Sequence, residues 1–272
     1  MTAVTSFFKT SCNKYLLWAI TFLVCSKFEL YAQKFSLGIK GGANITWAHF
    51  GDSDDRSEFN SKPTFGYTVG GLIAFPLKNN FTFVAEGAYA VKGRRISFND
   101  NTWENKTRYS FFDMTMLLRK SFHLYLKENL PTKWYINIGP EISYWLTAKG
   151  KIVVQDQGPS YTILFDKEPD ANFHNMYYNN INRWLFGLSV GLGFEAPIKK
   201  TQKLSFEFRF ISGHTYLGDK NSAYIEILGF KDTSLKQNLK VLQFTTAYTF
   251  DFDLKAAKKG KSTLDQIKTK KR

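Results

Sequence analysis

The stretch that decides the fold is WLFGLSVGLGFE, which runs from Trp184 to Glu195. Large apolar residues stand at every second position, and most positions between them hold Gly, Ser or Glu. Side chains of a β-strand point alternately to its two faces, so this period of two predicts a strand with one apolar and one small, polar face. Its length suits the ~9–11 residues with which a tilted strand crosses a bilayer.

The same alternation recurs in seven further segments. They are residues 35–47, 65–77, 81–91, 112–118, 134–146, 204–210 and 242–250. The whole chain of 272 residues is 43% hydrophobic and 17% aromatic, with a formal net charge of +14. That aromatic content argues against a disordered chain, and no stretch beyond residue 30 offers the ~20 apolar residues of a membrane-spanning helix.

The polar faces of these segments carry isolated charges of both signs. Small residues and nearly balanced charges suit a narrow barrel interior in which ions pair, whereas the Phe-, Leu- and Ile-rich faces suit lipid. A bilayer tolerates no unpaired strand edge. We therefore predict an all-β, eight-stranded antiparallel up-and-down transmembrane β-barrel, against the alternative of a soluble barrel with an apolar interior. The predicted interior charges are Lys40, Glu86, Lys92, Asp113, Arg119, Glu141, Glu195, Glu207 and Arg209.

Residues 1–33 have the pattern of a secretory signal peptide. Lys9 and Lys14 precede an apolar run at 16–24, and Ala32 offers a cleavage position; an uncleaved anchor is the alternative. Cys12 and Cys25 both lie in this leader, so thiol chemistry is not expected in the mature chain. We predict the barrel over 34–254 and a basic periplasmic tail over 255–272, which contacts lipid headgroups or stays solvated, with no nucleic-acid partner.

The connections differ in length. Those near 78–80, 127–131 and 197–202 are short, whereas those at 48–61, 93–107, 147–182 and 213–237 are long. Short periplasmic turns and long external loops are typical of membrane barrels. An even number of strands then places both termini in the periplasm. Aromatic residues near the strand ends are candidates for the interfacial girdles: Trp47, Trp134, Tyr144, Trp145, Trp184 and Tyr248.

Several strands resemble those of a known family. Residues 37–44 (LGIKGGAN) resemble the G-x-x-G-G-x-N opening of the PorT-like outer-membrane β-barrel family of Bacteroidota. Residues 112–119 (FDMTMLLR) resemble its L-E-I-P-L-L-L-K strand, with Thr115 in place of the proline, and 138–141, 191–195 and 205–210 resemble its later strands. The resemblance covers about 34–252 and implies an eight-stranded outer-membrane barrel, inserted by the barrel-assembly machinery. The basic tail departs from the aromatic terminus usual in such barrels.

Catalysis is not expected. His49 stands near Asp52, Asp54 and Asp55, and His214 near Asp219, but no serine-centred G-x-S-x-G motif accompanies either pair. The acidic run at 52–55 lacks the Gly and final Glu of an EF-hand, so neither a metal nor another cofactor is predicted.

We therefore expect a non-catalytic structural or interaction module of the outer membrane, accessory to secretion or envelope assembly. The alternatives are a narrow pore for small solutes and a lipid or peptide hydrolase at the rim. The expected partners are the lipid bilayer, lipopolysaccharide and an envelope protein. An aromatic segment is predicted to fold over the barrel mouth or to bind a partner: Tyr161, Phe165, Phe173, Tyr177 and Tyr178.

Overall fold

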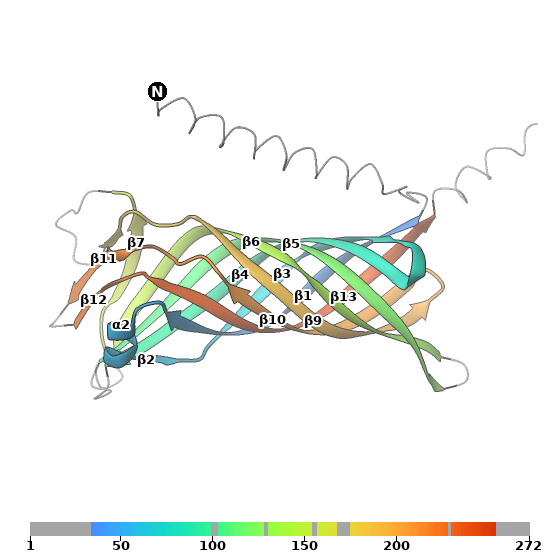
Figure 1. Ribbon diagram of the computed structural model, residues 1–272, viewed down its shortest axis with the longest axis horizontal. Coiled ribbons are helices and arrows are strands. Elements are labelled where there is room, and N and C mark those ends of the chain that lie inside the picture. Colours follow the sequence, from blue (N-terminus) through green and yellow to red (C-terminus); the bar gives the residue numbers. More distant parts are fainter. Residues whose placement is uncertain are drawn as a thin grey trace, which may run out of the picture. The chain divides into compact units, whose positions relative to one another are not determined.

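The computed structural model describes residues 34–98, 103–127, 130–153, 157–167, 175–227 and 230–253. Eight antiparallel strands pair edge to edge and the last pairs with the first, which closes the sheet into a barrel (Figure 1). In ring order they are β1 (Lys34–Phe50), β3 (Thr64–Pro76), β4 (Phe81–Phe98), β5 (Glu104–Lys127), β6 (Leu130–Val153), β9 (Trp184–Lys199), β10 (Gln202–Gly213) and β13 (Gln237–Asp253).

This ring confirms the predicted eight-stranded up-and-down barrel. The predicted signal peptide and basic tail lie outside the described residues. Among the residues that are described, no helix is long and apolar enough to cross a membrane.

The two faces of the ring strands are oriented as the alternation predicts. Apolar side chains at the outward positions are exposed, with Phe65 at 74% and Ile39 at 70%. Many inward positions hold small, polar or charged side chains, and Leu72, Val84 and Leu117 form a small buried apolar cluster beside them. Gly139 lets two strands approach closely, since a Cβ there would lie 1.8 Å from the backbone oxygen of Met116. The large outward residues include Leu37, Val69, Phe112, Met116, Ile136, Phe186, Leu192, Phe208 and Phe244.

The two ends of the barrel differ. At one, which we call the short-turn end, the 3₁₀ turn η1 (Lys78–Asn80) joins β3 to β4, and Lys34 pairs with Asp253. The other, the loop end, carries the small elements on the left of Figure 1. They are α2 (Ser53–Glu58), β2 (Phe59–Lys62), β7 (Ser160–Phe165), β8 (Asn175–Tyr178), β11 (Lys220–Ile227) and β12 (Phe230–Ser234).

The long connections contain more regular structure than predicted. β4 and β5 continue far into the expected loop 93–107, and their pairing reaches Ser97 and Glu104. The expected loop 147–182 contains the end of β6, and beyond it β7 and β8, which extend the sheet from that strand. Beyond the apolar band the strands no longer face lipid, so their outward positions need not be apolar. The apolar–polar alternation that predicts strands is therefore weaker there.

A hydrophobic core fills the loop end, and we call it the cap core. Its central residue is Trp145, which is fully buried, with its ring edge-on to Tyr109 at 5.0 Å and to Phe165 at 4.9 Å between centroids. The prediction that Trp145 belongs to an interfacial girdle is therefore wrong, because its position on β6 faces inward. The cap core comprises Ala48, Phe50, Phe59, Ile96, Tyr109, Phe111, Trp145, Ala148, Ile152, Tyr161, Ile163, Met176, Tyr178, Leu217, Leu235 and Leu239.

Candidate functional site

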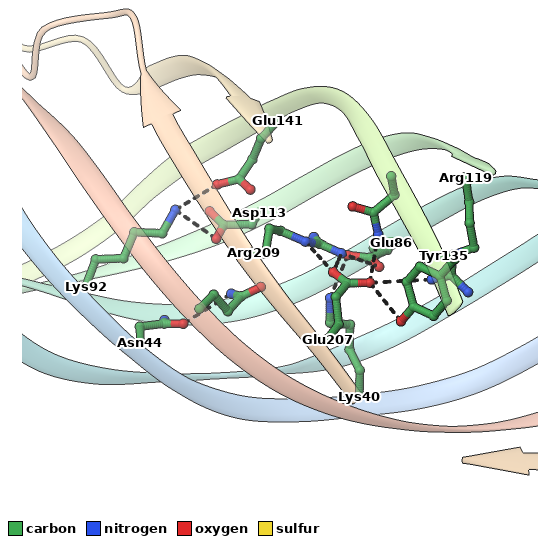
Figure 2. Close-up of polar contacts among 12 residues, drawn as sticks. Lys40, Asn44, Glu86, Lys92, Asp113, Arg119, Tyr135, Glu141, Glu207 and Arg209 are labelled. Carbon is green, nitrogen blue, oxygen red and sulfur yellow. Dashed lines mark hydrogen bonds and ion pairs between the residues drawn. The ribbon is translucent and has the colours of Figure 1, made fainter. Parts of the chain in front are cut away.

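The middle of the barrel interior is occupied by an ion cluster centred on Arg209 (Figure 2). Its Nη1 and Nη2 atoms donate to the two carboxylate oxygens of Glu86, at 2.7 and 2.9 Å, and it also pairs with Glu207. Arg209 comes from β10 and Glu86 from β4, which are opposite strands of the ring with three strands between them on either side. The guanidinium–carboxylate pair therefore spans the width of the interior.

Further side chains saturate the two carboxylates of this cluster. Lys40 Nζ lies 2.7 Å from Glu86 Oε2. Glu207 Oε2 accepts hydrogen bonds from Asn137 Nδ2 at 2.8 Å and from Tyr135 Oη at 3.2 Å. Because buried carboxylates are costly unless they are paired and hydrogen-bonded, these donors stabilise the charges in the interior.

A second ion cluster lies nearer the loop end. Lys92 Nζ contacts Asp113 Oδ2 at 2.9 Å and Glu141 Oε1 at 3.0 Å, and it donates to Ser143 Oγ at 3.3 Å. Ser143 in turn donates to Asp113 Oδ1 at 2.6 Å. All four residues are buried, so this cluster also blocks part of the cross-section.

Arg119 borders a vestibule at the short-turn end. Its guanidinium contacts Glu207 at 3.5 Å and Glu195 at 3.8 Å, and its Cζ lies 3.8 Å above the ring of Tyr135. The vestibule has a volume of about 560 Å³, and Lys203 on its wall pairs with Asp251 at 2.8 Å. A cavity of about 30 Å³ beside Lys92 has room for one or two water molecules.

The structure brings the nine predicted interior charges together, three of them in the Lys92 cluster and six around Arg209, where Arg119 and its neighbour Glu195 adjoin Glu207. Their neutral partners, Tyr135, Asn137 and Ser143, were not predicted from the sequence, nor was the hydrogen bond of 3.1 Å from Gln243 to Asn44. Each of them stands at an inward position of a predicted strand, and that position was the feature of the sequence from which an interior role could have been predicted. Which of them meet depends on the strand register.

The predicted aromatic segment contributes to the cap core. Tyr161, Tyr177 and Tyr178 are buried, and Phe165 packs against the cap core. Phe173 lies outside the described residues. Because the four described rings point into the protein, they stabilise the loop end rather than form its outer surface.

The loop residues considered for catalysis or metal binding either lie away from a suitable partner or are already paired with another side chain. Asp52 lies near Lys220 at 3.5 Å, and this cation holds the pKa of the Asp52 carboxyl below its usual range. Asp55 accepts a hydrogen bond of 2.6 Å from Ser234. Within the described part of the chain, neither His49 nor His214 hydrogen-bonds a carboxylate through its ring, and no group of three or more His, Cys, Asp or Glu is placed to hold a metal.

A family model described as outer membrane protein beta-barrel domain matches residues 31–214, in which β1 to β10 and both ion clusters lie. The chain belongs to this family. The outer membrane protein beta-barrel domain family places it in the outer membrane, and the exposed apolar band of the barrel is its bilayer-facing surface. No curated protein matches the chain.

Solved structures of other outer-membrane proteins are similar at low identity. OprG from Pseudomonas aeruginosa is 11% identical with a TM-score of 0.47, over 80% of this chain and 96% of OprG. Neisserial surface protein A is 11% identical with a TM-score of 0.38, over 79% and 96%. The outer membrane protease OmpT from Escherichia coli is 11% identical with a TM-score of 0.34, over 84% and 99%. None of these similarities indicates the activity of this family member.

Proposed function

We propose that this protein is a non-catalytic outer-membrane barrel with a closed interior, acting as a structural or interaction module of the envelope. The observation that carries the proposal is the bidentate contact between Arg209 and Glu86, which joins opposite walls of the ring at 2.7 and 2.9 Å. In a barrel of eight strands the interior is just wide enough for side chains. The paired ions therefore fill the barrel interior and do not line a conducting pore.

The alternative of a narrow solute pore has less support. A solute entering the vestibule at the short-turn end meets Arg119 and then the Glu207–Arg209–Glu86 cluster. Beyond it lie the buried Lys92 cluster and the cap core. Passage would separate ion pairs that the low-dielectric interior makes expensive to break.

The described residues at the rim do not form an assembled catalytic site, which argues against the alternative of a rim hydrolase. Within the part of the chain that the structure describes, His49 and His214 have no hydrogen-bonded carboxylate, and Asp52 is engaged by Lys220. A general base needs a partner that orients it and a nucleophile within hydrogen-bond reach. We therefore favour a non-catalytic role, accessory to secretion or envelope assembly.

The loop end is the surface that we propose for interaction with an envelope protein. Since long connections of membrane barrels usually face outward, we place this end outside and both termini in the periplasm, after insertion by the barrel-assembly machinery. The cap core makes the loop end a folded platform in which β7 and β8 extend the sheet from β6. The PorT-like resemblance agrees with such an accessory role, and it does not define the partner.

Ion conductance in a planar bilayer tests the closed interior. We expect the purified, folded full chain to give no stepwise current at ±100 mV, because the ion clusters and the cap core fill the interior. Insertion is verified by protection of the barrel from trypsin in the same membrane. Regular single-channel steps from the wild-type chain that disappear when the cap is fixed by a crosslink would instead establish the pore.

A further inference from the structure

Two rows of cations cross the outward surface of the barrel at the loop end. In the upper row, strand pairing places Lys62, Arg95, Lys106 and Lys151 side by side on β2, β4, β5 and β6. In the lower row, Arg108 of β5 pairs with Lys149 of β6. Together these six residues form what we call the cationic patch.

The patch places like charges directly opposite one another. Residues paired across antiparallel strands have Cβ atoms about 4.5–5.5 Å apart, and like charges in such pairs destabilise a sheet. Glu104 offsets the upper row by contacting Arg95 at 2.8 Å, Lys62 at 3.0 Å and Lys106 at 3.2 Å. Six cations against one carboxylate leave an excess of five positive charges.

The lower row, and Lys151 at the end of the upper row, have no such compensation. Arg108, Lys149 and Lys151 are exposed, and within the described residues none of them has a carboxylate partner. An Arg paired with a Lys in this arrangement gains stability when an anion with several oxygen acceptors binds between them.

The position of the patch indicates which anion is available. Just below the lower row, Tyr89 donates a hydrogen bond of 2.8 Å to Ser110, two residues from Arg108. Tyr144 packs on Trp184 with 4.7 Å between ring centroids at a similar level on β6 and β9. Tyr and Trp at outward positions mark the level of the lipid headgroups. The cations therefore begin where the apolar band gives way to headgroups.

We propose that the cationic patch binds the phosphate groups of an outer-leaflet lipid, with Arg108 and Lys149 as the principal contacts. The choice of leaflet rests on the proposed placement of the loop end outside. Lipopolysaccharide supplies two phosphates on its lipid A moiety at that depth. Its acyl chains would lie along the apolar faces of β5 and β6, below Arg108, at Phe112, Met116 and Ile138.

Native mass spectrometry of the purified full chain with diphosphorylated lipid A in neutral detergent tests this proposal. Each Lys or Arg near an anionic surface contributes about 1 kcal/mol, so Arg108→Gln with Lys149→Gln should weaken lipid A binding by about thirtyfold. Glu104→Gln should strengthen it, because the upper row then loses the carboxylate that contacts three of its four cations. Lipid A without phosphates should bind the wild type no better than the double variant binds the phosphorylated form.

Lys199→Gln with Lys200→Gln is the matched control, since it removes two exposed charges at the short-turn end and should leave lipid A affinity unchanged. Unaltered affinity in the Arg108/Lys149 variant would overturn the proposal, provided that circular dichroism shows the same barrel. So would equal binding of dephosphorylated lipid A, or displacement of lipid A by equimolar inorganic phosphate. The assay needs neither conductance nor a defined orientation, so its failure is distinguishable from failure of the proposed function.

Discussion

Replacing Arg209 with Met is expected to lower the free energy of unfolding of the barrel by about 3–5 kcal/mol. The change removes the cation that lies between Glu86 and Glu207, and both carboxylates are at least nine-tenths buried. Lys40 still pairs with Glu86, but Glu207 keeps only neutral donors and the 3.5 Å contact with Arg119. Urea titration of the barrel folded in phosphatidylcholine vesicles, followed by tryptophan fluorescence, measures the loss.

Two further variants test whether the loss of stability comes from an unbalanced buried charge or from any substitution in the barrel interior. Glu207→Gln with Arg209→Met leaves Lys40 paired with Glu86 and Arg119 near Glu195, so it should recover much of the lost stability. Lys203→Gln removes a cation that is 27% exposed at the vestibule wall, and solvated pairs contribute about 1 kcal/mol or less. If Arg209→Met unfolds no more easily than Lys203→Gln, the cluster does not stabilise the barrel.

The alternation of residue types was enough to predict the ring and the direction of its faces. A period of two fixes which residues share a face, and the bilayer requires that the apolar one lies outside. Lys40, Glu86 and Arg209 could therefore be placed in the interior before any pairing was known. The structure shows Lys40 at 5% exposure and Ile39 at 70%, which is the contrast that the pattern predicts.

The pairing of those charges could not be predicted in the same way. Whether Arg209 meets Glu86 or Glu141 depends on strand tilt and register, and these are set by cross-strand packing along the whole ring. The same limit applies to the cationic patch. Arg108 and Lys149 are 41 positions apart in the sequence, and only the β5–β6 register places them opposite each other.

The loop end differs from the prediction for a local reason. At Leu146 the register of β6 against β5 shifts by one residue, since Ser110 pairs with Thr147 and Phe111 with Trp145. Such a β-bulge reverses which positions face inward. Trp145 and Ala148 are thus both buried although the strict alternation would place them on opposite faces. The alternation alone does not show this reversal.

Replacing Trp145 with Ala should have the second large effect, a loss of about 3–5 kcal/mol in the free energy of unfolding. The indole is fully buried and packs against four aromatic rings, those of Tyr109, Phe111, Phe165 and Tyr178, with centroids 4.9–6.1 Å away. Truncation leaves a cavity in a core built from the loop-end parts of β5 and β6 and from the short strands β7 and β8. The same urea titration in vesicles measures the loss.

The matched control is Trp184→Ala, which removes the same side chain from an outward position that is 51% exposed. The two variants should differ by at least tenfold in the unfolding equilibrium constant, or about 1.4 kcal/mol. Limited trypsin digestion adds the location of the damage. Lys149 and Lys151 are exposed, but their backbone is paired with β5 and β7, so loss of the cap core should let trypsin cleave there before the membrane-embedded strands open. Equal losses for both tryptophans, or first cleavage at Lys199, would mean that the loop end is not held by an independent core. The interaction platform proposed above would then lack its structural basis.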